Sequence, residues 1–487
     1  MNDRLRTVEL LLDGQWTAAS AGTTLTTVTA ATGEPVAQVA AAGTDDADRA
    51  IAAAAGAAAE WGATSPGRRR EILEQAASLL SERSTDLAEL MSREMGAASG
   101  WCHFNVHVAV GMLKEAAAQT YSMVGEVIPS DVPGLTALGV RQPAGVTLGI
   151  APWNAPLILG VRAVAMPLAY GNPVVLKASE QTPATQAEIV HALHDAGVPA
   201  GAIGLITNAP DDAPQIVERL VTHPDVRRIN FTGSTRVGRI IGELAGKHLK
   251  RVVLELGGKA PLLVLRDAPL DDAVAAAAFG AFMNQGQICM STERIVVESD
   301  VLDEFSTKLA DHATSLRVGD PTDPATQIGP MVHAQAAGHV EALIEDAVNL
   351  GATVVTGGTR SGLFVQPTVL RGVTSKMRIY HEESFGPVAS IIEAGSEDNA
   401  VDIANDTPYG LSSAIFSSNV AHALQLAKRI KSGICHINGA TVHDEPQMPF
   451  GGVGDSGFGR FGSRAALEEF TELRWITVQD GSRHYPI

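Results

Sequence analysis

The chain has 487 residues, of which 45% are hydrophobic and 18% are charged. This composition can fill a large buried core and excludes an intrinsically disordered chain. Its 36 Lys and Arg against 54 Asp and Glu give a formal net charge of −18, which disfavours nucleic acid and anionic membrane surfaces as partners because both would be repelled.

Cysteine and the N-terminal residues indicate the compartment. Three cysteines without a Cys-x-x-Cys pair favour neither a disulfide framework nor a zinc site. The first residues lack the apolar core of a signal peptide, so we expect a cytoplasmic protein. The uncharged stretch 142–161 contains Pro143, Pro152 and Pro156, which would break a membrane-spanning helix.

The first half of the chain carries a helical pattern followed by an alternating one. Apolar residues at three- and four-residue spacing predict Ala-rich helices between residues 49 and 95. From residue 146 to 249, short β-branched runs alternate with helical runs, which is typical of a parallel sheet with right-handed crossovers. Such sheets bind ligands at the carboxyl ends of their strands, and a nucleotide is the default expectation.

The second half predicts another α/β unit, which begins after the segment VVLELGGK. Two pieces of the chain fit neither unit. Residues 124–144 are short β-like runs punctuated by Pro and Gly, and the late segment LRWITVQ predicts a single strand. We expect these two pieces to form a small projecting sheet used in assembly.

Polar residues follow several predicted strands of the first unit. Asn154 could donate to a developing oxyanion. Lys177 and Glu180 follow the next strand, where a carboxylate can accept hydrogen bonds from a ribose and would repel a 2′-phosphate. The turn at Gly233 and Ser234 begins a helix whose free N–H groups suit a pyrophosphate.

Cys289 and Glu255 are the candidate reactive groups. Cys289 lies in NQGQICMS, between a predicted helix and a predicted strand, where a thiolate can attack a carbonyl carbon. Glu255 ends a strand and precedes two glycines, although by itself this pattern also fits a surface carboxylate. Cys102 and Cys435 lie on a predicted helix and strand, and we interpret them as packing residues.

Other patterns resemble functional motifs but lack the required context. G-x-G-x-x-G occurs in residues 452–457 and 457–462, yet neither copy lies between the strand and helix of a βαβ unit. The protease-like sequence 454–457 needs a His and an Asp partner. His103 and His107 lie four apart on a predicted helix, where a structural role is favoured over a metal site, and we expect no metal.

The chain carries a set of motifs in the order and spacing of the aldehyde dehydrogenase superfamily: APWNAP, LKASE, FTGSTRVG, LELGGK, NQGQICMS, EESFGP and MPFGG. Within it, the chain resembles bacterial salicylaldehyde, benzaldehyde and vanillin dehydrogenases. The resemblance implies an α/β fold of three parts, assembled as a homodimer or homotetramer. These are a Rossmann-type NAD-binding domain (1–123 and 145–255), an α/β catalytic domain (256–455) and a small β oligomerisation element (124–144 and 456–487).

The resemblance also implies roles for the candidate residues. Cys289 would add to an aldehyde to give a thiohemiacetal, with Asn154 and the Cys289 N–H holding the oxyanion. Hydride would pass to NAD, with NADP as a weaker alternative, and Glu255 would activate the water that releases the acid. The residues similar to the family's cofactor contacts are Trp153, Lys177, Glu180, Gly233, Ser234, Glu383 and Phe385.

The residues expected to line the substrate site differ from those of several family members that act on aliphatic aldehydes. Ala155 stands where they carry Phe, and Arg162 stands where they carry Trp, which leaves room for a substrate ring flanked by Trp153 and Phe450. Arg162 would donate to ring oxygens or stack on the ring. The alternative for Arg162 is an ion pair with a carboxylate at a domain contact.

The sequence therefore predicts NAD-dependent oxidation of an aromatic aldehyde of the vanillin, salicylaldehyde, hydroxybenzaldehyde or benzaldehyde type to the carboxylic acid. Two alternatives stay open. One is an aldehyde dehydrogenase for aliphatic aldehydes or semialdehydes, and the other is a non-catalytic structural protein on the same fold. The presence of Cys289, Glu255 and Asn154 argues against the second alternative.

Overall fold

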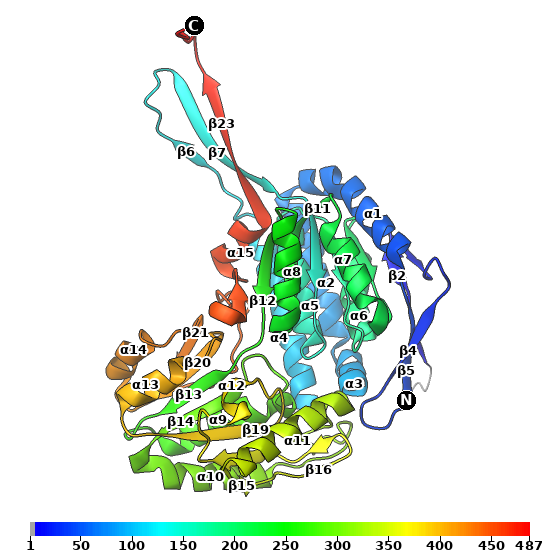
Figure 1. Ribbon diagram of the computed structural model, residues 1–487. Coiled ribbons are helices and arrows are strands. Elements are labelled where there is room, and N and C mark those ends of the chain that lie inside the picture. The colour runs from blue at the N-terminus through cyan, green and yellow to red at the C-terminus, as the bar shows by residue number, and fades with distance from the viewer. Residues whose placement is uncertain (1–4) are drawn as a thin grey trace.

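The computed structural model describes residues 5–487. Figure 1 shows two α/β units, one above the other, and a sheet that projects from the upper unit. The upper unit comes from the first half of the chain and the lower unit from the second half, with the C-terminal segment returning to the upper one.

The upper unit is built on a sheet with the strand order β22-β12-β11-β8-β9-β10-β2-β3. The strands from β12 to β10 run parallel, whereas β22, β2 and β3 pair antiparallel at the two edges. The strand bounds are β2 (Leu10–Leu12), β3 (Gln15–Thr17), β8 (Val146–Ile150), β9 (Val174–Lys177), β10 (Ile203–Ile206), β11 (Val226–Thr232), β12 (Arg251–Glu255) and β22 (Gly457–Phe458).

Helices cover both faces of this sheet. One face packs against α1 (Thr44–Ala63), α7 (Ala213–Thr222) and α8 (Thr235–Lys247). The other packs against α5 (Pro156–Ala169) and α6 (Pro183–Asp195), with α2 (Pro66–Glu82), α3 (Ser84–Met95) and α4 (Ser99–Gln119) outside them. Because both faces are covered, every residue of β8, β9 and β10 is buried.

The lower unit has a second sheet, with the order β15-β18-β19-β14-β13-β20-β21. All neighbours run parallel except the edge strand β15. The strand bounds are β13 (Ala260–Val264), β14 (Thr292–Glu298), β15 (Thr353–Thr356), β18 (Thr368–Arg371), β19 (Val388–Ala394), β20 (Ser412–Phe416) and β21 (Ile434–Ile437).

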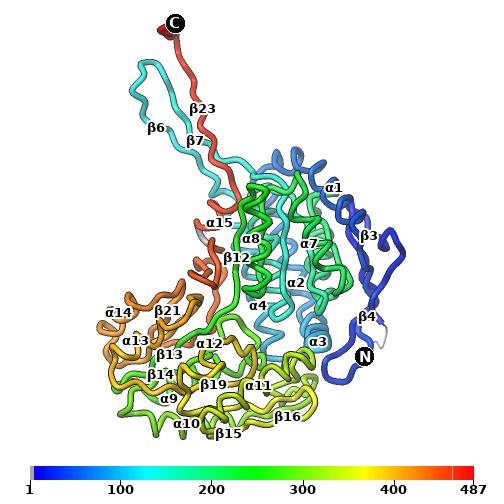
Figure 2. The backbone as a smooth tube through the Cα atoms, viewed as in Figure 1, coloured from blue at the N-terminus to red at the C-terminus, as the bar shows by residue number. Residues whose placement is uncertain are grey.

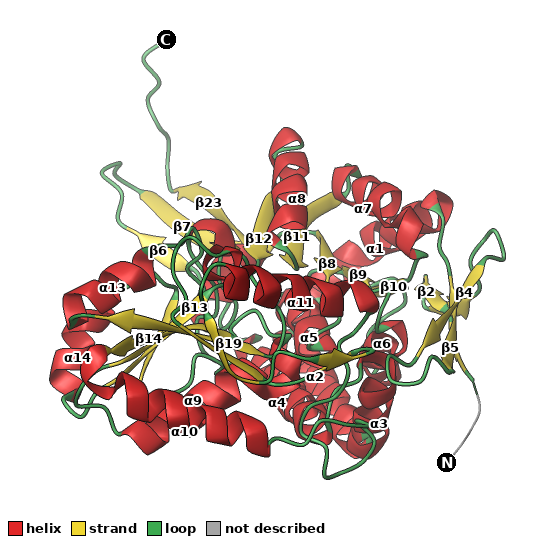
Figure 3. Ribbon diagram, turned by 60° about the horizontal axis from the view of Figure 1, so that its bottom comes forward, coloured by secondary structure: helices red, strands yellow, loops and turns green. Residues whose placement is uncertain are grey.

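This second sheet is also sandwiched between helices, as Figure 3 shows. The helices α9 (Leu270–Phe282) and α10 (Leu302–Ser315) pack on one face. The opposite face carries α11 (Ala334–Asn349), α12 (Arg378–His381), α13 (Glu397–Asn405) and α14 (Val420–Ala427). Both units are thus the α/β layers that the strand and helix alternation predicts.

The projecting sheet pairs segments from distant parts of the chain (Figure 2). Its order is β23-β7-β6, all antiparallel, with β6 (Glu126–Ile128), β7 (Leu135–Pro143) and β23 (Thr471–Gln479). It therefore joins the two pieces that the sequence leaves outside the α/β units. Residues 457–470 do not join it, because β22 pairs with β12 and α15 (Ser463–Phe470) packs against α5.

Smaller elements complete the description. A short sheet near the N-terminus has β1 (Arg6–Val8), β5 (Pro35–Ala40) and β4 (Thr24–Val28), and a two-stranded ribbon joins β16 (Arg360–Ser361) to β17 (Phe364–Val365). The uncharged stretch 142–161 folds as the end of β7, all of β8 and the start of α5. Among the helices of residues 5–487, none has the length and apolarity needed to cross a membrane.

Candidate active site

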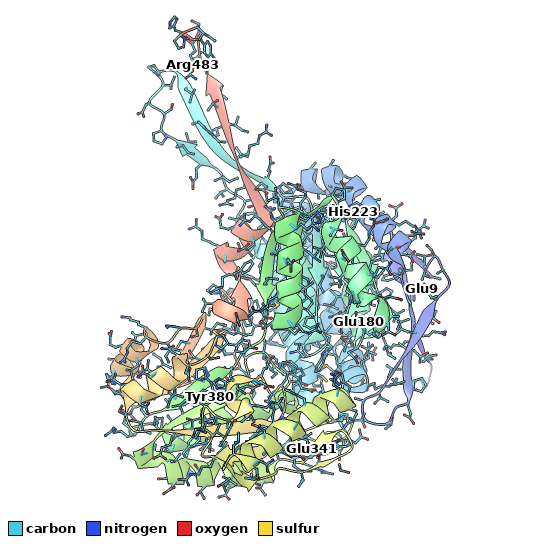
Figure 4. The ribbon with its side chains drawn as sticks, in the orientation of Figure 1. Glu9, Glu180, His223, Glu341, Tyr380 and Arg483 are labelled. Carbon is cyan, nitrogen blue, oxygen red and sulfur yellow. The ribbon has the colours of Figure 1, made fainter. Side chains whose placement is uncertain are left out.

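The carboxyl edge of the upper sheet gathers the polar residues that the sequence singles out. Trp153 and Asn154 follow β8, Lys177 ends β9, Gly233 and Ser234 follow β11, and Glu255 ends β12. Glu180 lies just before α6 on the same unit (Figure 4). The carboxyl ends of parallel strands meet at one edge of a sheet, which is why residues far apart in sequence share this region.

Cys289 lies in a constrained loop of the lower unit. The loop runs from the 3-10 turn η2 (Met283–Gly286) to β14, and Cys289 is half-buried in it. Asn284 and Gln285 have φ values of 50° and 57°, a costly conformation for residues other than glycine. The Gln285 side chain stabilises it by donating from Nε2 to the carbonyls of Gly96 (3.2 Å) and Pro330 (2.9 Å).

Glu255 and Cys289 face each other across the two units. Glu255 is 1% exposed, and neither of its carboxyl oxygens has a hydrogen-bond partner among the described residues. Burial raises the pKa of Glu255 to about 7, while the Arg162 charge and the Cys289 thiol oppose this rise. Burial, followed by the charge of Glu255, raises the pKa of the Cys289 thiol well above its ordinary value. Glu255 can therefore accept a proton near neutral pH, as a general base must.

Asn154 is held against the cysteine loop. Its Nδ2 donates to the backbone carbonyl of Gln287 at 3.0 Å. Its own carbonyl accepts from Trp101 Nε1 of α4 (2.9 Å) and from Asn284 Nδ2 (3.1 Å). The Asn154 amide thus bonds to a carbonyl two residues before Cys289, and one of its two N–H groups is left for another acceptor.

Glu383 and Phe385 reach the same region from the loop before β19. Glu383 accepts a hydrogen bond from the Gly258 N–H at 3.0 Å, and a Cβ at Gly257 would lie 2.8 Å from its Oε2. Gly257 therefore leaves room for the Glu383 carboxyl, and Gly258 leaves room for the Cys289 backbone carbonyl, whose oxygen would clash with a Cβ at that position. Burial above all raises the pKa of Glu383 to about 8. The ring of Phe385 meets Trp153 edge to face, with centroids 5.8 Å apart.

Glu293 and Lys259 position this loop, and the sequence analysis missed both. The Glu293 carboxylate accepts from the Ser384 N–H (2.9 Å) and from the Phe385 N–H (3.1 Å). Lys259 Nζ donates to the second carboxylate oxygen of Glu293, Oε2, at 2.5 Å. These bonds hold Phe385 at a φ of 45°. A charged residue inside an otherwise apolar buried strand, as Glu293 is in TERIVVE, is the signal that could have found the pair.

The carboxyl edge of the upper sheet also offers hydrogen-bond donors and acceptors that a cofactor could use. Lys177 Nζ forms an ion pair with the Glu180 carboxylate, which also accepts from Asn208 Nδ2 at 3.1 Å. Ser234 is exposed and caps α8, accepting from the Val237 N–H. A carboxylate beside a buried lysine and an accessible helix N-terminus fit the ribose and pyrophosphate of a dinucleotide.

Arg162 lies in a buried ion pair. Its Nη2 is 2.5 Å from Asp444 Oδ2, and the two side chains are 5% and 6% exposed. The guanidinium carbon lies 4.1 Å from the centroid of the Phe450 ring, and Ala155, also buried, immediately precedes the same helix. The carboxylate that the sequence left as one alternative for Arg162 is therefore Asp444, which the sequence analysis did not single out.

A cavity of about 760 Å³ opens between α4 and the loop 442–446. Its lining includes Phe104, Val108, Val442, His103, His107 and Asp444. Asp444 also lines a second space of about 20 Å³ together with Arg162 and Phe450. Because Asp444 lines both spaces, the cavity is the candidate route for a substrate, although Cys289 and Glu255 are not among its lining residues.

The remaining motifs fold as structural elements. Gly457 pairs with Glu255 as an antiparallel edge, so the glycine-rich segment is no phosphate-binding turn. Ser456 is buried and its hydroxyl is bonded to two backbone groups. Cys102 is buried, which raises its pKa to about 12, and Cys435 lies half-buried on β21. Within residues 5–487, no group of three His, Cys, Asp or Glu side chains is placed to hold a metal ion.

Known proteins share both the sequence and the fold. The sequence model described as the aldehyde dehydrogenase family matches residues 16–476. The chain is 57% identical to a vanillin dehydrogenase of Pseudomonas sp. (strain HR199 / DSM 7063) over 99% of both chains. The crystal structure of a salicylaldehyde dehydrogenase from Pseudomonas putida G7 complexed with salicylaldehyde matches with a TM-score of 0.97 and 42% identity, covering 99% of this chain and 100% of that one.

A more distant structure includes a cofactor. Betaine aldehyde dehydrogenase from Staphylococcus aureus in complex with NAD+ matches with a TM-score of 0.94 and 30% identity, covering 98% of this chain and 95% of that one. The family model matches most of the chain, and the chain is 57% identical to a relative that it covers almost completely. The chain belongs to the aldehyde dehydrogenase family.

Proposed function

We propose that this chain oxidises aromatic aldehydes to carboxylic acids with NAD as the hydride acceptor. The observation that carries the proposal is the pairing of Cys289 with Glu255, a fully buried carboxyl whose pKa is about 7. The relatives named for vanillin and salicylaldehyde support the aromatic substrate class.

The first step forms a bond between Cys289 and the aldehyde. The Cys289 thiol loses its proton to solvent, and Sγ adds to the carbonyl carbon to give a thiohemiacetal. The second N–H of the Asn154 amide and the backbone N–H of Cys289 donate to the oxygen that gains charge. NAD, when bound, would supply the acceptor for the hydride that leaves the former carbonyl carbon.

The second step breaks the resulting thioester on Cys289. Glu255 takes a proton from the water that attacks the thioester carbon, the C–S bond breaks, and the acid leaves. Because its carboxyl oxygens have no protein partner in the described part of the chain, Glu255 is free to bond to that water. A buried site also strengthens each of these polar interactions.

We assign the cofactor to the carboxyl edge of the upper sheet. Lys177 and Glu180 would bind the adenosine ribose, and the helix N-terminus at Gly233 and Ser234 would bind the pyrophosphate. The other assigned contacts, on the nicotinamide side, are Trp153, Glu383 and Phe385. On this assignment, residues 1–123 with 145–255 form the cofactor domain and residues 256–455 form the catalytic domain.

We assign assembly to residues 124–144 and 471–487, with the projecting sheet as the contact. Its exposed apolar side chains include Val127 at 77%, Trp475 at 74% and Leu473 at 59% exposed, a patch typical of a protein interface. The expected assembly is a homodimer or homotetramer in the cytoplasm. Light scattering should give a mass of two or four subunits for the wild type and one subunit for Trp475→Glu, and a monomeric wild type would contradict the assignment.

A panel of aldehydes tests the substrate class. Purified protein is assayed for NADH formation with benzaldehyde, its hydroxy and methoxy derivatives, straight-chain aldehydes and succinic semialdehyde. We expect the aromatic aldehydes to have the highest kcat/KM, and NAD to exceed NADP. A higher value for a straight-chain aldehyde or a semialdehyde would assign the chain to that substrate class instead, and no turnover with any aldehyde would favour a structural role.

A further inference from the structure

Asp444 has one carboxyl oxygen that the protein leaves unused. Its Oδ2 forms the ion pair with Arg162, whereas Oδ1 is buried and has no hydrogen-bond partner among residues 5–487. The Glu445 N–H lies beside the carboxyl but makes no hydrogen bond to Oδ1. A buried acceptor without a partner is costly, and its presence indicates a ligand or a water that satisfies it.

The position of Asp444 relates this oxygen to the substrate route. Asp444 lines both the large cavity and the smaller space that contains Arg162 and Phe450. Its charge and that of Arg162 both act on the pKa of Glu255, so the ion pair lies close to the reacting groups. Phe450 covers one face of the Arg162 guanidinium. Burial raises the pKa of Asp444 and the Arg162 charge opposes that rise, while the ion pair fixes the direction of the carboxyl group.

We propose that Asp444 Oδ1 accepts a hydrogen bond from the ring hydroxyl of a hydroxylated aromatic aldehyde, and that Arg162 holds Asp444 in position. This inference rests on the proposed function and adds the specificity-determining residue. The chemistry favours a neutral phenol over a phenolate. Two carboxyl groups, Asp444 and Glu255, stand near a single guanidinium, and a phenolate has no proton to donate to Oδ1.

Other ionisable groups also face this cavity. They are His103, His107 and Lys114 of α4 and His443 and Glu445 of the loop. Glu445 is the matched control for Asp444, because it is the next residue, lines the same cavity and accepts hydrogen bonds from His443 (2.9 Å) and Gln447 (2.8 Å) instead. Its side chain is 41% exposed, against 6% for Asp444.

The first experiment compares Asp444→Asn, Glu445→Gln and the wild type. Each is assayed with hydroxybenzaldehydes and with fluorobenzaldehydes substituted at the same ring position, since fluorine is small and cannot donate. In Asp444→Asn, the new amide would turn its oxygen toward Arg162 and place its NH2 at the position of Oδ1, so the acceptor becomes a donor. The ratio of kcat/KM for hydroxy over fluoro substrate should fall roughly ten-fold, the scale of one hydrogen bond to a charged group. Glu445→Gln should leave the ratio unchanged.

The hydroxy-to-fluoro ratio of kcat/KM is compared between the wild type and each variant. The electronic effect of a substituent on reactivity is the same in every enzyme and therefore cancels. An unchanged ratio in Asp444→Asn, or an equal fall in Glu445→Gln, would overturn the role of Asp444. Benzaldehyde separates this result from the proposed function. Turnover of benzaldehyde with unaltered ratios refutes only the role of Asp444, whereas no turnover of any aromatic aldehyde refutes the function itself.

A second measurement needs no variant. Phenol and fluorobenzene are tested as competitive inhibitors of benzaldehyde oxidation by the wild type, at a pH where phenol is neutral. Phenol should bind roughly ten-fold more tightly, because only phenol donates to Oδ1. Phenol is also the better hydrated of the two and loses more hydration on binding, so it would bind more weakly than fluorobenzene if Oδ1 accepted no hydrogen bond. Weaker binding of phenol would therefore overturn the proposal even if Asp444→Asn does not fold.

Discussion

The substitution Glu255→Gln isolates the second chemical step. Glu255 is fully buried, its carboxyl oxygens have no protein partner within residues 5–487, and its pKa is about 7. Glutamine has nearly the same shape but cannot take a proton from water. Loss of a general base slows a step by ~10²–10⁴-fold, which corresponds to about 3–5 kcal/mol in the barrier.

The first step should survive this substitution. The negative charge of Glu255 raises the pKa of the Cys289 thiol, so its removal makes the thiolate easier to form. Rapid mixing with NAD and benzaldehyde should therefore give a burst of about one NADH per subunit, as expected when acylation is fast and hydrolysis limits turnover. The steady rate after the burst should be at least ~100-fold below that of the wild type.

The pH dependence gives a second readout of the same group. Glu255 must be ionised to accept a proton, so it is inactive below its folded pKa and active above it. The hydrolytic rate of the wild type should rise as pH increases through about 7, and this rise should be absent in Glu255→Gln.

Glu94→Gln is the matched control. Glu94 is also buried with a pKa of about 7, but it caps α6 by accepting from the Ala184 N–H and from the N–H and hydroxyl of Thr185. This variant should lose about 1–3 kcal/mol of stability and keep the wild-type rate. A steady rate within ten-fold of the wild type in Glu255→Gln would refute the reasoning. A missing burst would show that Glu255 acts before hydride transfer.

Three further substitutions test the other assigned groups. Cys289→Ala should abolish oxidation and leave NAD binding by calorimetry near normal, and a few per cent of residual turnover would contradict a covalent intermediate. Glu180→Gln should raise kcat/KM with NADP relative to NAD by about ten-fold, since a like charge facing the 2′-phosphate is removed; an unchanged ratio would place the ribose elsewhere. Arg162→Leu should destabilise the fold by ~3–5 kcal/mol, because Asp444 is left buried and unpaired. Since the Arg162 charge lowers the pKa of Glu255, its removal should also move the kcat profile to higher pH, and a profile that stays in place would separate Arg162 from the catalytic carboxyl.

The sequence alone was sufficient for the layers and for the region in which the candidate residues lie. Strand and helix alternation depends on local periodicity, which neighbouring residues determine by themselves. The carboxyl ends of parallel strands meet at one edge in any such sheet, so Asn154, Lys177 and Glu255 could be expected to share a region before any contact was known. The structure places them there, and the family match agrees with the motifs that surround them.

Tertiary packing decided the features that depend on distant segments. The local sequence pattern left Glu255 open to a surface role. Segments distant in sequence, among them those of Cys289 and Gly457, pack around Glu255, and its burial raises its pKa. The ion pair between Arg162 and Asp444 joins residues 282 positions apart, and the bonds from Lys259 and Phe385 to Glu293 also cross separate elements. Such contacts depend on how distant helices and loops pack against one another, and no short stretch of sequence determines that packing. For the same reason residues 457–470 pack on the upper unit, although their sequence did not separate them from the strand that follows.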